Sequence, residues 1–205
     1  MEEFSDLWTP KKVELLLVVG DFKKATEIEF ESEEWYDGQE NKKVDGNAAK
    51  FFEDISEKLG LVFEKQTVTA KSNRAYSEDN YEHVRNIERT TYIVAKTESD
   101  IEKLKRADEG GDDSLYGEVY GFPETSITAY KNDELAEISD IPEDVRASEA
   151  YIFTTFMLSK NDWKKELEIS QQWSDFVKKI SPKIHGEQMK IMKEIVEDRE
   201  RGNKK

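Results

Sequence analysis

The chain has 205 residues, and 46 aspartates and glutamates against 31 lysines and arginines give it a formal net charge of −15. This excess of negative charge repels phosphate backbones and anionic lipid, so nucleic acid is disfavoured as a partner and no membrane partner is expected. The sequence contains no cysteine, which excludes disulfides, thiolate metal sites and cysteine nucleophiles and is typical of a reducing compartment.

The first residues, Met1 to Asp6, are acidic, whereas a secretory signal needs a basic start followed by an apolar stretch. No later apolar run approaches the roughly 20 residues that cross a bilayer. We therefore expect a cytoplasmic protein. The acidity fits either a high-salt cytoplasm or ordinary solubility, and the sequence leaves both interpretations open.

Helix and strand signals alternate in the first part of the chain. Thr9 followed by Pro10 predicts a capped helix start, and the apolar residues after them predict a central helix, Thr9–Gly20, that is buried on nearly all sides. Alternating polar and apolar residues predict a strand at Glu27–Phe30. The turn-rich stretch Ser32–Gly46 then predicts a loop or an insertion.

A second helix is predicted at Asn47–Leu59, with Asn47 as its cap and Gly60 at its end. Alternation in Leu61–Lys71 predicts a strand, and the β-branched and aromatic residues of Thr90–Lys96 predict another. The polar segment Ser72–Glu82 lies between these two strands. Together with the first strand, they predict a small sheet.

Helical signals predominate from about residue 100 onward. Ser99 or Asp100 is expected to open a helix that ends in a flexible acidic turn, Asp108–Asp113. Two short helical pieces are predicted next, at Tyr116–Tyr120 and Pro123–Tyr130.

A longer apolar segment, Glu143–Leu158, predicts a helix, but residues 150–157 are aromatic and β-branched and fit a strand equally well. Both alternatives stay open. Asp162 is expected to cap a helix that is broken at Ser181-Pro182, and a last helix follows.

These elements predict an α+β protein with a small, mostly antiparallel three-stranded sheet and a C-terminal helical layer. The sheet belongs to residues 1–110 and the mainly helical part to residues 111–205, and we expect both parts to pack as one compact unit. Large aromatic residues of the helical part are expected to fill its core, and any face left exposed would be a dimer or partner surface. These residues are Tyr151, Phe153, Phe156, Trp163, Trp173 and Phe176.

The best local candidate for a ligand site is the segment Gly117–Ser126. Its Gly121-Phe122-Pro123 step predicts a tight turn directly before a helix N-terminus, where free backbone N–H groups attract anions. A small anion or phosphate ester could be held there by these N–H groups and nearby hydroxyls. The alternative is that the proline merely starts a helix well. The candidate ligand-binding residues are Glu118, Tyr120, Phe122, Glu124, Thr125 and Ser126.

The same segment resembles part of a known family. The run Tyr116–Tyr130, with the sequence Gly-Phe-Pro-Glu-Thr-Ser inside it, is similar to the marker segment of an uncharacterised archaeal domain family, in which Gly-Tyr-Pro-Glu-Cys-Cys starts a helix. Residues Phe156–Trp163, followed by a helix and Ser181-Pro182, are similar to the family's second marker, where a Pro-Cys-Ser segment and a nearby Cys precede a helix. The resemblance implies a related α+β fold.

The family's cysteines would be natural ligands for a soft metal, but this chain has none of them. Thr125 and Ser126 replace the first pair, and residues around Leu158 and Asp162 fill the later positions. Metal binding therefore does not carry over, and neither a metal nor a cofactor is expected. The resemblance implies a divergent relative that has lost a metal site, and the family itself has no established function.

No catalytic motif stands out in the rest of the chain. Its two histidines, His83 and His185, lie far apart, and Ser159 with His185 forms no recognisable triad because no nucleophile elbow surrounds that serine. Carboxylate pairs such as Asp144 with Glu149 could perform acid–base chemistry only if a pocket shifted their pKa values. Whether the protein is an enzyme stays open at this stage.

Three hypotheses of function follow. The leading one is a non-catalytic binding or protein-interaction module, whose partner is another protein or a second copy of the chain. The alternative is a metal-independent enzyme or small-anion-binding protein that uses the helix N-terminus at Pro123. The third, nucleic acid association, is disfavoured by the net charge. It would use Lys160, Lys164, Lys165, Lys178 and Lys179.

Overall fold

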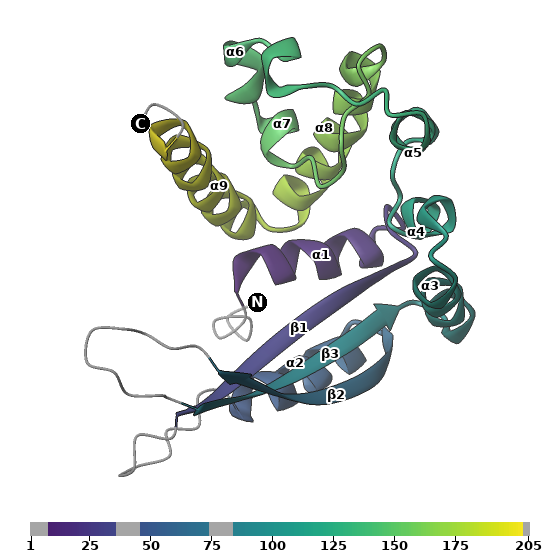
Figure 1. Cartoon of the computed structure of the whole chain (residues 1–205), viewed down its shortest axis with the longest axis vertical. Coiled ribbons are helices and arrows are strands. Elements are labelled where there is room, and N and C mark those ends of the chain that lie inside the picture. The colour runs from purple at the N-terminus through teal and green to yellow at the C-terminus, as the bar shows by residue number, and fades with distance from the viewer. Residues whose placement is uncertain (1–7, 36–45, 74–83, 203–205) are drawn as a thin grey trace.

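The fold is built on a three-stranded antiparallel sheet with the strand order β1-β3-β2 (Figure 1). The structure is a computed structural model that describes residues 8–35, 46–73 and 84–202. The strands are β1 (Ala25–Trp35), β2 (Val62–Asn73) and β3 (Val84–Ala95). Their antiparallel pairing and the helices around them confirm the predicted α+β class.

One face of the sheet is covered by α1 (Thr9–Val19) and α2 (Gly46–Lys58). In β3, Val94 lies opposite Thr26 of β1 and Phe63 of β2, and alternation directs every second side chain to this face. The buried cluster between the strands and these two helices comprises Leu15, Val18, Ile28, Phe30, Phe52, Ile55, Leu61, Tyr92 and Val94.

The opposite face is covered at one end by α3 (Glu98–Gly110) and α4 (Asp113–Val119). The strands carry small or β-branched residues there, so both helices approach closely and bury their own apolar residues. This second cluster comprises Ala25, Ile93, Ala95, Ile101, Leu104 and Val119.

The C-terminal helical layer packs on the side of α1 that faces away from the sheet (Figure 1). Val13, Leu16 and Leu17 of α1 belong to the same buried cluster as Trp173 and Val177. Helix α1 is therefore enclosed by the sheet and the helical layer, which confirms the expected central helix. The layer consists of α5 (Glu124–Lys131), the 3-10 helix η2 (Ile138–Asp140), α6 (Glu143–Arg146), α7 (Glu149–Ile152), α8 (Trp163–Ile180) and α9 (Pro182–Gly202).

Two predicted loops begin inside strands. Ser32 to Trp35 continue β1, because their backbone stays paired with β3 as far as Trp35, which lies opposite Arg85. Likewise Ser72 and Asn73 belong to β2. Gly46, the last residue of the first segment, begins α2. The rest of both segments lies in 36–45 and 74–83, outside the described residues, and so does His83.

Two predicted helix starts are also corrected. The residue before α1 is Trp8, and the Thr9 hydroxyl, instead of capping the helix, donates a hydrogen bond to Glu187 in α9 at 2.9 Å. Helix α3 begins at Glu98 because the hydroxyl of Thr97 accepts from the Asp100 backbone N–H.

The acidic segment Asp108–Asp113 is not the flexible turn that was expected. Its first three residues continue α3 to Gly110, and Gly111 then adopts the left-handed conformation that commonly ends a helix. The side chain of Asp112 caps α4 by accepting from the backbone N–H groups of Ser114 and Leu115. The charged side chains of this segment thus lie at helix ends, where their backbone is ordered.

The segment Glu143–Leu158 is neither one helix nor a strand. It forms two short helices, α6 and α7, because Ser148 caps the second one through its hydroxyl. Residues 153–158 then run without regular structure, and their buried aromatic side chains face the helical core. The boundaries predicted at Asp162 and at Ser181-Pro182 are confirmed as the two ends of α8, but the Asp162 side chain makes no capping hydrogen bond.

None of the helices in the described ranges combines the length and the apolar character that crossing a membrane requires.

Candidate functional site

The predicted tight turn is present between α4 and α5. Gly121 has a φ of +71°, and an added Cβ would lie only 1.9 Å from the carbonyl oxygen of Phe22. Only glycine fits both the conformation and the close approach of the two backbones. Pro123 precedes α5, which begins at Glu124.

The two hydroxyls expected to hold an anion have partners inside the protein. The Thr125 hydroxyl donates to the Glu166 carboxylate at 2.6 Å, and the Ser126 hydroxyl donates to the Met157 carbonyl oxygen at 2.6 Å. Glu166 is only 1% exposed and also accepts from the backbone N–H of Ser159 at 2.7 Å. These bonds join the start of α5 to α8 and to the irregular segment that precedes α8.

Two of the other candidate residues, Glu118 and Tyr120, do not converge with this pair. Glu118 is exposed, whereas the Tyr120 hydroxyl accepts a hydrogen bond from the backbone N–H of Glu27 on β1. The ring of Tyr120 stacks on Tyr116 with 4.5 Å between centroids, and burial raises the pKa of Tyr120 well above its ordinary value. Tyr120 therefore closes the edge of the sheet and has no visible role toward a ligand.

Two adjoining apolar cavities lie beside this turn, with volumes of about 390 Å³ and about 630 Å³. Thr154, Phe156, Met157 and Met192 line both cavities. Because the cavities share these walls, we treat them as one surface and call it the methionine groove. The first cavity adds Leu135, Ala136, Glu137, Ile138, Ile141, Tyr151, Ile152, Leu158 and Ile195, and the second adds Asp113, Tyr116, Gly117, Phe122, Ser126, Ile127, Tyr130 and Thr155.

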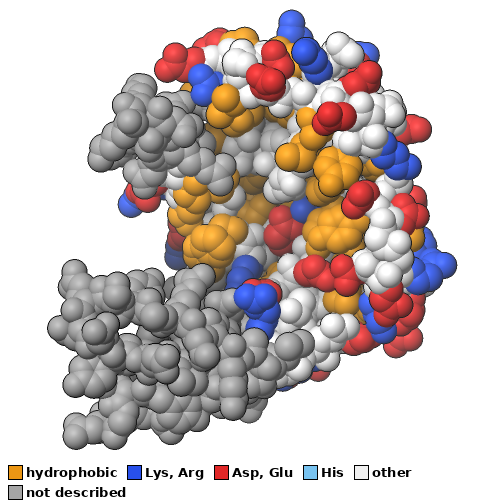
Figure 2. All heavy atoms as spheres, viewed as in Figure 1, with side chains coloured by type: hydrophobic (Ala, Val, Ile, Leu, Met, Phe, Trp, Pro, Cys, Tyr) orange, Lys and Arg blue, Asp and Glu red, His pale blue; other side chains and the backbone are white. Residues whose placement is uncertain are grey.

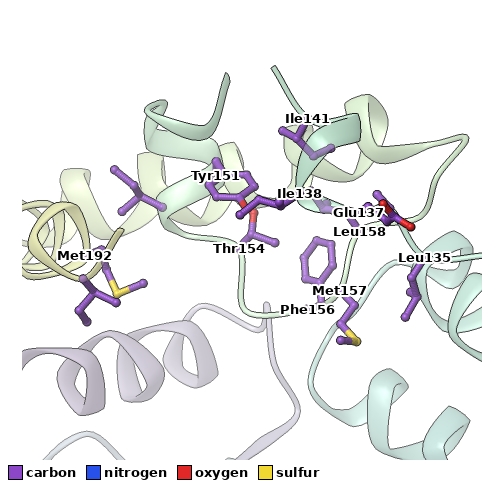
Figure 3. A pocket seen from close by; sticks show the side chains of 13 residues that line it. Leu135, Glu137, Ile138, Ile141, Tyr151, Thr154, Phe156, Met157, Leu158 and Met192 are labelled. Atoms are coloured by element: carbon purple, nitrogen blue, oxygen red, sulfur yellow. The ribbon is translucent and has the colours of Figure 1, made fainter. Parts of the chain in front are cut away.

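The groove is open to solvent and strongly apolar. In Figure 3, Met192 from α9 and Leu135 lie at opposite ends of the first cavity, with Ile138 and Phe156 between them. Figure 2 shows this face of the molecule hollowed, with apolar side chains gathered around the hollow. Two large apolar residues of the groove are highly exposed: Ile138 at 60% and Met157 at 59%.

A smaller polar cavity of about 260 Å³ adjoins the groove. Leu135 lines the groove and its neighbour Glu134 lines the polar cavity, and Leu135 is joined to Ser159 by an isolated β-bridge. The linings of the polar cavity and the groove are therefore neighbours along the chain, although they share no residue. It is lined by Glu124, Thr125, Thr128, Ala129, Glu134, Ser159, Asn161 and Asp162.

The six predicted site residues are thus divided between surfaces. Phe122 and Ser126 line the groove, Glu124 and Thr125 line the polar cavity, and Glu118 and Tyr120 line none of the three cavities. The sequence did not predict the exposed residues of the groove, above all Ile138 and Met157. A sequence signal did exist: residues 153–158 are apolar without the period of a helix or a strand.

His185 takes part in a buried cluster that does not have the geometry of a catalytic triad. Its Nε2 lies 2.9 Å from the Ser174 hydroxyl and 3.6 Å from the Glu149 carboxylate, so serine and carboxylate meet the same ring nitrogen. A triad requires them on opposite nitrogens. Ser174 is fully buried, and burial lowers the pKa of His185. Ser159, for which the sequence predicted no triad, accepts from the Asp162 backbone N–H.

Glu149 also departs from the acid–base role considered for it. Burial acts to raise its pKa, but hydrogen bonding and charge from Lys178, with smaller help from His185 and Ser174, hold that pKa below its ordinary value. A carboxylate kept ionised in an ion pair is suited to joining α7 to α8 and α9. Asp144, its proposed companion, is exposed on α6.

A partly buried ion pair lies close to the groove and was not predicted from the sequence. The Lys23 ammonium group lies 2.6 Å from the Glu14 carboxylate and 3.4 Å from the hydroxyl of Thr155, which lines the second apolar cavity. Thr26 donates to the same carboxylate oxygen at 2.9 Å. The charge of Lys23 is thus balanced within the core.

The residues on which the resemblance to the archaeal family rests are divided between neighbouring cavities. Thr125 and Asp162 line the polar cavity, Ser126 binds the carbonyl of Met157, and Leu158 precedes Ser159 of the same cavity. Within the described ranges, no group of three or more histidines and carboxylates is placed to hold a metal ion.

Comparisons of the chain with protein-family models, with curated proteins and with solved structures found no match.

Proposed function

We propose that this chain is a non-catalytic, cytoplasmic protein-interaction module whose binding surface is the methionine groove. The observation that supports this most is the exposure of Ile138, Met157 and Tyr130, at 60%, 59% and 51%, around one continuous apolar hollow. Large apolar side chains grouped in this way on a charged surface are typical of binding sites.

The energetics favour an occupant for this groove. Each exposed side chain of this size that becomes buried contributes about 1.5–3 kcal/mol, because apolar area leaves water. Met157 and Met192 add adaptability, since unbranched thioether side chains can adjust to different partners. The groove therefore offers both affinity and tolerance of shape.

The polar groups of the groove support binding without chemistry. Its lining carboxylates are Asp113 and Glu137, which belong to different cavities, and no histidine or lysine lines the groove among the described residues. The Thr154 hydroxyl donates to the Ala150 carbonyl oxygen and lies 2.9 Å from the Ser170 hydroxyl. A nucleophile beside a base, which catalysis of group transfer would need, is not supported here.

The small-anion alternative receives less support. The hydroxyls of Thr125 and Ser126 donate to protein oxygens, and the nearby cavity is lined by the carboxylates of Glu124, Glu134 and Asp162. An anion at the start of α5 would have to displace the hydrogen bonds of these two hydroxyls and overcome the repulsion of these three carboxylates.

We also propose that the chain is a divergent relative of the uncharacterised archaeal family it resembles. Thr125 and Asp162 line one cavity, and Ser126 and Leu158 are next to residues of that lining in the chain, which supports this because the family's cysteines would then lie close to one ancestral metal site. This proposal adds no activity, since that family has no established function.

The proposed function can be tested by selecting peptides from a random display library on the wild-type protein. Selected peptides should lose at least about tenfold in affinity with the Ile138→Asp and Met157→Asp variants, because each places a charge in the apolar contact. Ile180→Asp is the matched control, since Ile180 is 43% exposed on α8 but does not line the groove.

Sedimentation of the same variants tests whether the partner is a second copy. A dimer that dissociates only with the groove variants would make the chain its own partner. Peptide binding and sedimentation that are identical in the wild-type protein and both groove variants would refute the proposed function.

A further inference from the structure

We infer that the partner presents a cationic amphipathic segment, with apolar side chains in the methionine groove and a Lys or Arg side chain over the adjoining polar cavity. This inference rests on the proposed function and specifies the chemistry of its partner. Two observations carry it: the sign of the charges that line the cavities, and the contact between the apolar and acidic compartments.

The charges around the groove all have one sign. Among the described residues, the charged side chains that line the three cavities are carboxylates, and Lys, Arg and His are absent from all three linings. The chain as a whole contains 31 lysines and arginines, so their exclusion from this surface is a local property. The five carboxylates are those of Asp113, Glu124, Glu134, Glu137 and Asp162.

The two carboxylates best placed to receive a cation are Glu124 and Glu134. Both are exposed, and neither makes a side-chain hydrogen bond or ion pair in the part of the chain that the structure describes. Asp162 already binds the Lys165 ammonium group at 2.9 Å. A guanidinium or ammonium group from a partner would therefore meet two carboxylates whose charges are not yet balanced by a contact.

The spacing of the compartments suits a single segment. Glu134 precedes Leu135 and Ser159 follows Leu158, so the linings of the polar cavity and the groove are neighbours in the chain at these two places. The bridge between Leu135 and Ser159 holds these two strands of chain together. A helix that buries one apolar face would carry its flanking basic residues to this boundary.

The same charges disfavour other occupants. A fatty acid or an anionic lipid would bring its head group toward carboxylates, and a second copy would bring another net charge of −15. A cationic segment gains from both the local charges and the long-range field, which accelerates association at low salt.

Defined peptides test this inference. The probe is a synthetic amphipathic helix of about 18 residues composed of leucine and lysine at helical spacing. Its controls are a leucine and glutamate peptide of the same pattern and a serine and lysine peptide of the same charge. Calorimetry at low and at moderate salt should show that only the leucine and lysine peptide binds, with affinity that falls as salt rises.

Charge-neutralised proteins locate the contact. The triple variant Asp113→Asn, Glu124→Gln, Glu134→Gln should bind the probe at least about fivefold more weakly, because each removed charge contributes to the attraction. A matched variant removes the same number of charges from exposed carboxylates outside the cavities and should change affinity less than about twofold. Its substitutions are Glu102→Gln, Glu109→Gln and Glu168→Gln.

The outcomes separate this inference from the proposed function. Equal weakening by the two triple variants, or equal binding of the glutamate peptide, would overturn the cationic partner. If library-selected peptides bind through Ile138 and Met157 but lack basic residues and salt dependence, the interaction module stands and only its cationic partner is refuted. If substitutions at both of these residues leave all binding unchanged, the proposed function itself fails.

Discussion

Replacing Glu166 with glutamine tests the buried contact that holds the start of α5. The carboxylate accepts from the Thr125 hydroxyl at 2.6 Å and from the Ser159 backbone N–H at 2.7 Å, and it lies in the first turn of α8, where the helix dipole favours negative charge. Glutamine keeps one acceptor oxygen for the Ser159 N–H and replaces the other by an NH₂ group, which can donate to the Thr125 hydroxyl but no longer accepts from it. The negative charge is lost from both contacts, and so is the bond that Thr125 donates.

The expected cost follows from that geometry. A hydrogen bond to a charged group contributes about 1.5–3 kcal/mol, so we expect Glu166→Gln to lower the free energy of unfolding by about 2 kcal/mol. For a chain of this size, 1 kcal/mol corresponds to about 2–4 °C, which gives a fall in Tm of about 4–8 °C. Thr125→Val should cost about 1 kcal/mol alone and less in the Glu166→Gln background, because both changes remove the same bond.

Urea unfolding followed by tryptophan fluorescence measures these values, since Trp173 is buried in the helical core. The matched control is Glu168→Gln, an exposed residue on the same helix, which should change stability by less than about 0.5 kcal/mol. If Glu166→Gln unfolds at the same urea concentration as this control, the carboxylate is not a structural anchor. The Thr125 hydroxyl would then be free for a ligand, and the anion hypothesis would regain its support.

Three further predictions concern the turn, the histidine cluster and the partly buried ion pair. Gly121→Ala should lower the free energy of unfolding by more than about 3 kcal/mol, whereas Gly111→Ala, with φ of +59° and open space around it, should lower it by about 1 kcal/mol. Equal shifts in Tm for the two variants would contradict the close approach at Gly121. Because burial lowers the pKa of His185, the unfolded chain takes up its proton first, so stability should fall as the pH drops below about 6.5 and level off below the folded-state pKa. Thermal melts between pH 7 and pH 5 measure this fall in stability, which should be smaller in a His185→Asn variant. If Tm falls with pH equally in the variant and the wild-type protein, His185 is not the group responsible. Lys23→Met should cost about 2 kcal/mol because Glu14 loses its ammonium partner, and a chemical-denaturation midpoint equal to wild type would show that the pair is dispensable.

The sheet and the central helix were predictable because their signals are local. Alternation marked parts of β1 and β2, and β-branched and aromatic residues marked part of β3. The unbroken apolar run of Leu15 to Val18 indicated a helix with neighbours on both sides. Strand ends were not predictable in the same way. Trp35 and Asn73 lie in long arms of the sheet that are stabilised by backbone pairing, to which side-chain pattern contributes little.

The candidate site was only partly predictable, because most of its contacts join residues far apart in the chain. The turn at Gly121 follows from local sequence, but the partner of the Ser126 hydroxyl is 31 residues away and that of the Thr125 hydroxyl is 41 residues away. The exposure of Met157 depends on where α9 and the segment around Leu135 pack, which no short pattern encodes. The resemblance to the archaeal family stays a prediction.

The enclosure of α1 has a consequence for synthesis on the ribosome. Helix α1 is made early, yet its outer face is covered by α8 and α9, and Thr9 bonds to a residue 178 positions later. Until those helices emerge, Val13, Leu16 and Leu17 remain uncovered on a nascent chain whose sheet can already form. Slow closure of such distant contacts exposes apolar surface to aggregation. Premature termination before α8 should therefore yield an insoluble product, and a separately supplied fragment containing α8 and α9 should restore its solubility.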